Sequence, residues 1–317
     1  MLQSYRGGQA AGGGLELFSN LIRRFRKADG FILALGGGGG RGLAHLGVLE
    51  VLEEHNLRPA AIVGTSIGAL FGSMYAHTPD AGRIRNRVIR YLDSEKFSQL
   101  NIPLLEGVEM EDTSWLSRLA AVARQSILYT RAATDIAVAD IDSLIDMVEE
   151  LCTAGDFANL NIPMHITSVQ FPTGECHLIS KGNLSRAIAA SMAVPGVFNP
   201  VEIDGGHYLD GALASEVPAR EGQMVTSGGQ VVVAVNVGSR PDPMNVPTHL
   251  IGMIDWATQV KALYLRQYEK QHADLLIEPL VGFTQWHDFS NPEQEIQRGR
   301  DAALEKMPQL LKMLGNG

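Results

Sequence analysis

A run of five glycines, Gly36 to Gly40, separates two apolar stretches and constrains the fold more than any other feature of this chain. The stretch before it, Phe31 to Leu35, is uninterrupted and typical of a buried strand, whereas Leu43 to Leu52 has apolar residues at helical spacing. The predicted order is therefore strand, glycine loop, helix. Glycines let the backbone turn its N–H groups inward, and the following helix adds its positive end, so this loop predicts a site for a negatively charged group.

A second turn from strand to helix is predicted at residues 64–68, Gly-Thr-Ser-Ile-Gly, which follow the apolar Ala60 to Val63. In a nucleophile elbow the serine occupies a strained backbone conformation, and side chains two positions to either side would collide with the turn. Gly64 and Gly68 remove that collision, and the small and apolar residues that follow suit a packed helix. Ser66 is therefore the leading candidate for a catalytic nucleophile.

The glycine loop has two functional interpretations. Gly37, Gly39 and Gly42 satisfy the G-x-G-x-x-G pattern of dinucleotide sites, but that pattern requires a carboxylate after the next strand, where Ser66 stands instead. We favour an oxyanion hole, because adjacent parallel strands would bring the loop beside the elbow. Its candidate donors are the backbone amides of Gly37, Gly38, Gly39 and Gly40. A purely structural glycine turn is the third interpretation.

Four blocks of this sequence resemble, in the same order, the patatin-like phospholipase family. Residues 37–42 with the following Leu-Ala-His-Leu-Gly-Val-Leu resemble its glycine-rich block, and residues 64–68 are similar to its elbow. Residues 190–201, Ala-Ser-Met-Ala-Val-Pro-Gly-Val-Phe-Asn-Pro-Val, resemble a block of the bacterial members, and residues 210–212 match their Asp-Gly-Ala motif. The resemblance implies a three-layer α/β/α fold with a mainly parallel central sheet, with Gly211 as a supporting residue. Arg41, also a supporting residue, would either add positive potential near a phosphate headgroup or cap local carbonyl groups.

The resemblance also implies a serine–aspartate dyad, in which Asp210 rather than a histidine takes the proton from Ser66. A serine hydroxyl is a weak nucleophile at neutral pH and an ordinary aspartate is a weak base, so the site must raise the proton affinity of the carboxylate. Partial burial would do so, and hydrogen bonds would orient it. By position alone, Asp210 is more typical of a turn residue that binds its own backbone. Ser191 and Pro195 are expected to shape the site.

A conventional triad is the alternative, because the chain contains nine histidines and histidine is the usual general base. In the order of an α/β-hydrolase triad the histidine follows the serine and the acid, which leaves His249, His272 and His287. None of these three has a distinctive local sequence. For His45 and His207 we expect structural or polar-network roles.

Composition limits the class of protein. The chain has 317 residues, of which 45% are hydrophobic, and its net charge of −9 argues against a nucleic-acid partner. It lacks a run of about 18 apolar residues and a secretory signal at its amino terminus, so we expect a cytoplasmic protein. Cys152 and Cys176 match no metal-ligand spacing, and a disulfide is not expected. We expect no cofactor and no metal, and therefore activity without calcium.

The first thirty residues differ in charge from the rest, with five basic residues against two acidic ones. Within residues 15–27, apolar residues recur at helical spacing and basic ones cluster towards the end. The segment predicts a basic amphipathic helix with two alternative roles. It would lie on the inner face of the membrane as a peripheral contact, or pack on the core with its charges against the helix dipole.

Residues 31–317 are expected to form the catalytic domain, after the N-terminal segment of residues 1–30. A helical insertion at about 80–160 would separate the elbow from the next strand. Apolar residues there are candidates for an acyl-chain pocket, although such stripes more often belong to a core: Leu104, Leu105, Trp115, Leu116, Leu119, Ile127 and Leu128. The remaining pattern predicts a hairpin at 163–180, a strand at 231–237, a helix at 248–272, a strand at 275–278 and a final helix at 292–314.

Taken together, the motifs predict a serine hydrolase that cleaves acyl esters of phospholipids or lysophospholipids through an acyl-enzyme. An acyltransferase with the same nucleophile is one alternative. A lipid-binding regulator without catalytic activity is the other.

Overall fold

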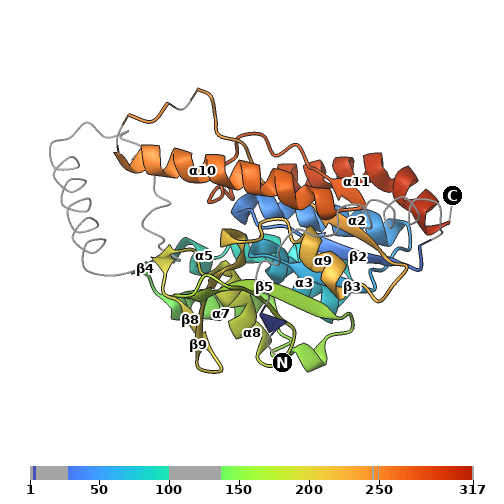
Figure 1. Cartoon of the computed structure of the whole chain (residues 1–317), viewed down its shortest axis with the longest axis horizontal. Coiled ribbons are helices and arrows are strands. Elements are labelled where there is room, and N and C mark those ends of the chain that lie inside the picture. Colours follow the sequence, from blue (N-terminus) through green and yellow to red (C-terminus); the bar gives the residue numbers. More distant parts are fainter. Residues whose placement is uncertain (1–2, 5–27, 100–136, 245, 249, 316–317) are drawn as a thin grey trace, which may run out of the picture.

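The computed structural model describes residues 3–4, 28–99, 137–244, 246–248 and 250–315 (Figure 1). Its strands are β1 (Gln3–Ser4), β2 (Phe31–Leu35), β3 (Ala61–Gly64), β4 (Ala137–Ala139), β5 (Met164–Phe171), β6 (Cys176–Ile179), β7 (Gly196–Phe198), β8 (Val201–Ile203), β9 (Gly206–Asp210), β10 (Val231–Val235) and β11 (Leu275–Ile277). Its α-helices are α2 (Ala44–Glu54), α3 (Ile67–His77), α4 (Ala81–Leu92), α5 (Glu95–Gln99), α7 (Ile141–Leu151), α8 (Leu184–Met192), α9 (Ala219–Val225), α10 (Leu250–Glu269) and α11 (Pro292–Leu314). Short 3-10 turns are η1 (Gly39–Leu43), η2 (Phe157–Asn159), η3 (Gly211–Leu213) and η4 (Lys270–His272).

Nine of the described strands form one large sheet with the order β1, β6, β5, β3, β2, β10, β11, in which β9 pairs with both β5 and β8, and β4 and β7 form a separate two-stranded sheet. The five strands from β5 to β11 in that order are parallel to their neighbours, whereas β6, β9, β8 and β1 pair in antiparallel fashion. Helices cover both faces of the sheet (Figure 1). The predicted α/β class with a mainly parallel central sheet is therefore confirmed.

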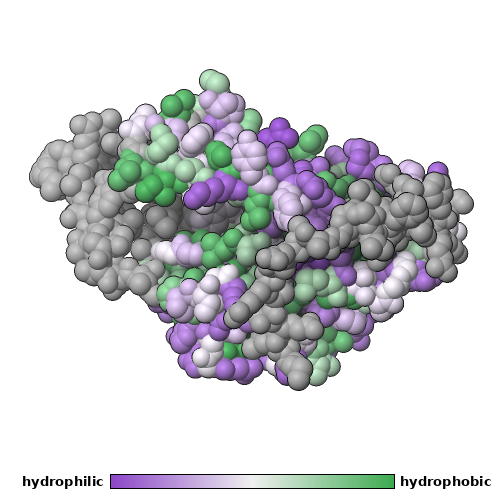
Figure 2. Space-filling model, viewed as in Figure 1, coloured by the Kyte–Doolittle hydropathy of each residue, from purple (hydrophilic) through white to green (hydrophobic). Residues whose placement is uncertain are grey.

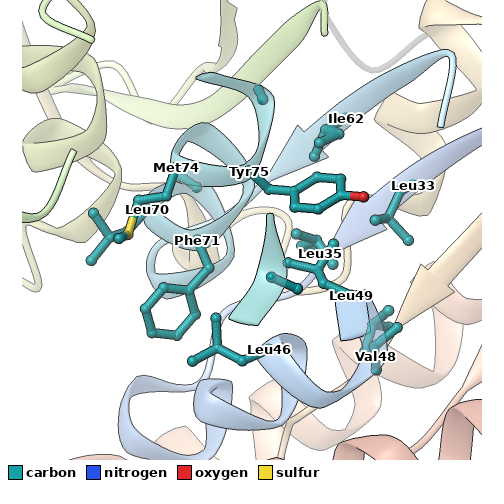
Figure 3. Close-up of a cluster of buried hydrophobic side chains, with 14 of the residues drawn as sticks. Leu33, Leu35, Leu46, Val48, Leu49, Ile62, Leu70, Phe71, Met74 and Tyr75 are labelled. Carbon is teal, nitrogen blue, oxygen red and sulfur yellow. The ribbon is translucent and has the colours of Figure 1, made fainter. Parts of the chain in front are cut away.

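The parallel strands have continuous apolar sequences because both of their faces are buried in the core. All five residues of β2 are buried, because the two faces of the strand meet different helices. On one face Leu33 and Leu35 pack with side chains of α2 and α3 (Figure 3). On the other face Ala34 packs with Val232 of β10 and with residues around α9. The side chains in Figure 3 that build the first of these layers include Leu46, Leu49, Ile62, Leu70, Phe71, Met74 and Tyr75.

The strand order places the glycine loop and the elbow at one edge of the sheet. The chain runs from β2 through β3 to β5 in one direction and returns to the other side of β2 with β10 and β11. The carboxyl ends of β2 and β10 therefore flank the point where the direction of winding reverses, which is where ligands bind in open α/β sheets. The loops that follow β2, β3 and β10 all emerge at this edge.

Several predicted elements match the structure, and a few strands went unpredicted. The expected hairpin is β5 and β6, the expected final helix is α11, and the expected helix at 248–272 is α10 with η4. The predicted helical insertion contains β4, which pairs in parallel with β7. The N-terminal β1 extends the sheet beside β6. Two sets of residues predicted from the sequence lie outside the described residues. They are the amphipathic segment 15–27 and the candidate pocket residues from Leu104 to Leu128.

The surface carries apolar side chains around the start of α10 and in the loop before it (Figure 2). The most exposed of these are Met244, Val246, Leu250 and Ile254, each more than half exposed. Among the residues that the structure describes, none of the helices has the length and apolar character needed to cross a membrane. The start of α10 and the loop before it thus expose apolar side chains at the surface of the protein.

Candidate functional site

Ser66 lies in the tight turn between β3 and α3, with φ 53° and ψ −122°. A positive φ is rare for a residue with a side chain and strains the backbone. Both flanking glycines are required by close contacts. A Cβ atom at Gly64 would lie 2.6 Å from Ala69 Cα, and one at Gly68 would lie 2.3 Å from the Leu35 carbonyl oxygen. The strand, turn and helix therefore have the geometry of a nucleophile elbow.

The carboxylate of Asp210 faces this serine from the end of β9. Ser66 Oγ donates a hydrogen bond of 3.0 Å to Asp210 Oδ2, and Ala212 N donates one of 2.8 Å to Asp210 Oδ1. One oxygen thus holds the turn that follows β9, as expected of an aspartate before glycine, and the other reaches the serine. The turn contact expected from the sequence is observed, and the contact with Ser66 has the geometry that a serine–aspartate dyad would require.

Burial raises the pKa of Asp210 to about 7. The side chain is only 4% exposed, and removal from water disfavours the charged form. The hydrogen bonds from the Ala212 amide and the Ser66 hydroxyl act in the opposite direction, and the negative charge of Glu216 adds to the increase. A carboxylate whose pKa lies near neutral pH is a much better proton acceptor than an ordinary aspartate.

Ser191 and Thr65 hold the elbow from either side. Ser66 N donates a 2.8 Å hydrogen bond to Ser191 Oγ, from α8. Thr65 Oγ1 donates to the Ser215 carbonyl oxygen at 2.8 Å and lies 2.7 Å from Thr167 Oγ1. The sequence indicated a shaping role for Ser191 but gave no signal for Thr65 or Thr167.

Two of the supporting positions predicted from the sequence differ in how the site constrains them. A Cβ atom at Gly211 would lie 2.3 Å from Thr167 Oγ1, so a side chain there would displace the strand that carries Asp210 or its neighbour β5. Pro195 is exposed in the loop between α8 and β7, two residues after Ala193, whose carbonyl oxygen accepts a hydrogen bond from Asp210 N at 3.0 Å. At Gly211 the close contact itself requires glycine.

The glycine loop lies beside the nucleophile. A Cβ atom at Gly37 would lie 3.5 Å from Ser66 Cβ. Gly37 N donates to the Glu216 carbonyl oxygen at 2.8 Å, and Gly40 N donates to the Trp286 carbonyl oxygen at 2.7 Å. In the described part of the chain, the amides of Gly38 and Gly39 have no hydrogen-bond acceptor.

These contacts narrow the set of candidate oxyanion donors. The loop is held at Gly37 and Gly40, and the two amides between them remain for a ligand. Gly39 has φ 58°, and a Cβ atom there would lie 1.9 Å from the Trp286 carbonyl oxygen, so glycine is required for two reasons. The amide of Ile67, the first residue of α3, also has no acceptor among the described residues. This amide was not among the donors predicted from the sequence, although the residue after an elbow serine commonly donates to the oxyanion.

Arg41 is buried and its guanidinium binds the protein itself. Its Nε donates to the Val237 carbonyl oxygen at 3.0 Å, and Nη1 donates to Ser239 Oγ at 2.8 Å and to the Thr284 carbonyl oxygen at 3.0 Å. Burial lowers the pKa of Arg41 to about 10, which still leaves the group charged at neutral pH. Its observed contacts are those of a side chain that caps local carbonyl groups and fastens the loop after β10 to the loop before α11.

In the described part of the chain, no histidine ring makes a hydrogen bond to Ser66 or Asp210. His45 donates from Nε2 to the Gly36 carbonyl oxygen at 2.8 Å, and burial lowers its pKa to about 4. This is the structural role expected for it. His207 is exposed on β9, and His287 follows Trp286 in the loop before α11. His272 packs edge-on against Tyr268, and His249 lies outside the described residues.

The described residues contain neither a metal-ligand cluster nor a disulfide. No group of three or more histidine, cysteine, aspartate or glutamate side chains suited to a metal ion occurs within the described ranges. Cys152 and Cys176 are both buried and remain as thiols.

This chain is similar to one protein family and to several known proteins. The family model described as patatin-like phospholipase matches residues 33–222, which include the glycine loop, the elbow and Asp210. A patatin-like phospholipase domain-containing protein of Caenorhabditis elegans is 31% identical over 226 residues, which cover 70% of this chain and 14% of that protein. A lysophospholipase NTE1 of Candida albicans is 29% identical over 226 residues, covering 69% of this chain and 14% of the relative.

The chain thus spans a small part of these relatives' length. Among solved structures, VipD from Legionella pneumophila has a TM-score of 0.49 and 16% identity, with 90% of this chain and 67% of VipD covered. Because the family model matches more than half of the chain and contains all the residues of the candidate site, the chain belongs to the patatin-like phospholipase family.

Proposed function

We propose that this chain is a lipid acyl hydrolase that cleaves an ester bond of phospholipids or lysophospholipids. The observation that carries the proposal is the 3.0 Å hydrogen bond from Ser66 Oγ to a buried carboxylate whose pKa is raised to about 7. Membership of the family supports the lipid class, and the NTE1 relative, named a lysophospholipase, supports lysophospholipids in particular.

In the proposed reaction Ser66 Oγ attacks the ester carbonyl carbon while its proton passes to Asp210 Oδ2. The negative charge that develops on the carbonyl oxygen is stabilised by the amides of Gly38 and Gly39, with Ile67 as a third candidate donor. When the tetrahedral intermediate collapses, the ester C–O bond breaks and Asp210 returns the proton to the leaving alcohol. The product of this half-reaction is an acyl-enzyme at Ser66.

Water completes the cycle. Asp210 takes a proton from the attacking water, the acyl–serine bond breaks, and Ser66 recovers its proton from Asp210. A carboxylate with a pKa near 7 suits both directions of transfer, because it holds the proton long enough to deliver it and releases it at neutral pH.

Labelling with a fluorophosphonate, followed by hydrolysis assays on a panel of phospholipids and lysophospholipids, tests the proposal. We expect Ser66 to be labelled, and we expect Ser66→Ala and Asp210→Asn to abolish turnover while circular dichroism remains that of the wild type. Absence of labelling would favour a regulator without catalytic activity. Turnover that persists in Asp210→Asn, but is lost on replacement of His287 or His249, would favour a histidine base.

Product analysis in the presence of alcohols and thiols separates hydrolysis from acyl transfer. Free fatty acid as the main product supports the hydrolase, and acylated acceptor as the main product would favour the transferase. We expect the same turnover in the presence of a chelator of divalent cations, because all proposed steps use side chains and backbone amides of this chain.

The proposed substrate resides in a lipid surface, and we propose that residues 15–27 provide a peripheral contact with it. The charge and apolar spacing of that segment support this role. The exposed apolar side chains at the start of α10 are compatible with contact between the protein and a lipid surface (Figure 2).

A further inference from the structure

The carbonyl group that holds the glycine loop belongs to Glu216, in the turn between η3 and α9. Gly37 N donates to the Glu216 carbonyl oxygen at 2.8 Å, and a Cβ atom at Gly36 would lie 3.0 Å from the same oxygen. The glycine loop and this turn are therefore in direct contact. The conformation of residues 215–217 determines where the Gly37 amide is anchored.

Two buried side chains of α10 hold this turn in place. Arg266 Nη1 lies 2.8 Å and 2.7 Å from the two carboxylate oxygens of Glu216, and its Nη2 donates to the Ser239 carbonyl oxygen. The carboxylate of Glu269 accepts from Glu216 N at 3.0 Å and from Val217 N at 2.9 Å. Arg266 is 5% exposed and Glu269 is 4% exposed. The side chain and the backbone of Glu216 are thus both fixed from the same helix.

A buried ion pair is poor evidence of stabilisation, because removing two charges from water offsets much of their attraction. Apolar residues of similar volume at these positions would serve the stability of the fold about as well. Because the Glu216 carbonyl oxygen binds the Gly37 amide, the pair is placed to fix the position of the glycine loop.

We propose that the Glu216–Arg266 ion pair positions the oxyanion loop. The pair fixes the carbonyl group that binds the Gly37 amide, and this anchor keeps the neighbouring Gly38 and Gly39 amides in place beside Ser66. Arg266 and Glu216 are positioning residues in this scheme, since neither contacts the reacting atoms. The inference rests on the proposed hydrolase function and extends it to a residue that lies 200 positions from Ser66 in the sequence.

The pair has a second connection with the site through charge. The negative charge of Glu216 contributes to the raised pKa of Asp210. Burial raises the pKa of Glu216 itself, and Arg266 and Arg41 act against that increase. The neighbours of the Asp210 carboxylate are the Ser66 hydroxyl and the Ala212 amide. The charged and titratable groups around Glu216 and its turn are Arg41, Arg266, Glu221 and Glu269. Removal of the Glu216 charge should therefore lower the pKa of Asp210.

The main test replaces both members of the pair, Glu216→Leu with Arg266→Met, so that neither member is left buried without the other. The matched control is Glu54→Leu with Arg300→Met, which removes a more exposed pair of the same two residue types between α2 and α11 (Nη2 to Oε1, 2.8 Å). It also removes the contact of Arg300 Nη1 with Glu50 Oε2 at 2.9 Å, and Glu50 keeps Arg85 as a partner. Folding is checked by circular dichroism and urea unfolding. The readouts are kcat and KM on a lysophospholipid, and hydrogen exchange of the backbone amides in residues 36–42.

We expect kcat of the Glu216→Leu/Arg266→Met variant to fall roughly 10- to 100-fold with KM nearly unchanged, because misplaced catalytic groups reduce the rate of the chemical step. Hydrogen exchange in residues 36–42 should become faster. The Glu54→Leu/Arg300→Met control should match the wild type in both measurements. A folded double variant with wild-type kcat and exchange would overturn the proposal.

Two further variants keep the test decisive if the double variant does not fold. Arg266→Lys retains the charge and should keep more activity than Arg266→Met, and Glu216→Gln should move the acid limb of kcat/KM to lower pH. An unchanged acid limb together with unchanged exchange would count against the proposal. Wild-type protein without Ser66-dependent turnover would reject the hydrolase function instead, and hydrogen exchange would then decide the positioning role alone.

Discussion

Two opposing effects act on the pKa of the Asp210 side chain. Burial makes its charged form unfavourable, and this raises the pKa to about 7, while hydrogen bonds from the Ala212 amide and Ser66 favour the charged form. Burial dominates. Asp210 can therefore gain or lose a proton near neutral pH, and the fold is less stable when this buried carboxylate is ionised.

The pH dependence of activity should reflect this pKa directly. Asp210 must be unprotonated to accept the proton of Ser66, so kcat/KM should rise with pH through a midpoint near 7 and level off above it. An aspartate in water, with an ordinary pKa of about 3.9, would give full activity already at pH 5. Initial rates on a soluble ester between pH 5 and 9 measure the midpoint, and a plateau that extends down to pH 5 would contradict the assignment.

Replacement of Asp210 by asparagine should stabilise the fold at alkaline pH. Between its unfolded and folded pKa values, the folded chain holds a proton that the unfolded chain has released, so the stability of the wild type falls as pH rises from about 4 to 7. The Asp210→Asn variant lacks the titrating group, so its stability should exceed that of the wild type at pH 8 by up to about 4 kcal/mol, with a much smaller difference at pH 4. Urea unfolding at both pH values is the measurement. The exposed Asp93→Asn serves as control, and an equal difference at both pH values would contradict the expected linkage.

At the scale of single elements, α3 can begin directly after Ser66 only because the positions two residues away on each side, Gly64 and Gly68, have no side chain. The Leu35 carbonyl oxygen, the last of β2, occupies the space where a Cβ atom at Gly68 would lie. The elbow is thus packed directly against the neighbouring strand. This close approach brings the glycine loop after β2 to within contact of the serine.

The requirement for glycine at position 68 can be tested by comparing its replacement with that of a glycine in another helix, Gly82 of α4. Gly68→Ala should destabilise the fold by about 2–4 kcal/mol, since its Cβ atom would lie 2.3 Å from a backbone oxygen that cannot move easily. Gly82→Ala is the matched control in α4, where the nearest atom to a new Cβ is 3.7 Å away, and it should stabilise the fold by about 0.5–1 kcal/mol. Urea unfolding of both variants measures the two effects. Equal small effects would show that the close approach at Gly68 is relieved easily.

At the scale of the whole molecule, charge is distributed unevenly along the chain. The net charge is −9, yet the first thirty residues contain five basic and two acidic residues. A net negative protein is repelled by anionic lipids as a whole, so a basic segment would determine which part of it approaches a membrane.

Replacement of Arg23, Arg24, Arg26 and Lys27 by glutamine should weaken binding to anionic vesicles by up to about 1,000-fold, because each basic residue near such a surface contributes about 1 kcal/mol and each 1.4 kcal/mol changes affinity about tenfold. The control variant replaces four exposed basic residues elsewhere by glutamine: Arg83, Arg90, Lys96 and Lys181. Vesicle flotation with Ser66→Ala protein measures binding apart from turnover. Equal loss of binding in both variants would assign the effect to net charge rather than to residues 15–27.

The sequence by itself determined the longer strands, the two glycine turns, the candidate nucleophile, its candidate carboxylate partner and the family. Each of these follows from short windows, in which glycine at a fixed position or an apolar period restricts the local backbone, or from motifs in a fixed order. The positions of β4, β7 and β1 could not be obtained in this way, because such short strands exist only through pairing with distant partners.

Tertiary structure alone decided what the side chains around the nucleophile do. Arg41 caps a carbonyl group 243 positions away, and the Gly37 amide is held by a turn that α10 fixes from behind. The pKa of Asp210 likewise depends on how completely distant segments exclude water. Local sequence contains no information on these contacts, since hydrogen bonding, burial and charge act through space between segments that only the folded sheet brings together.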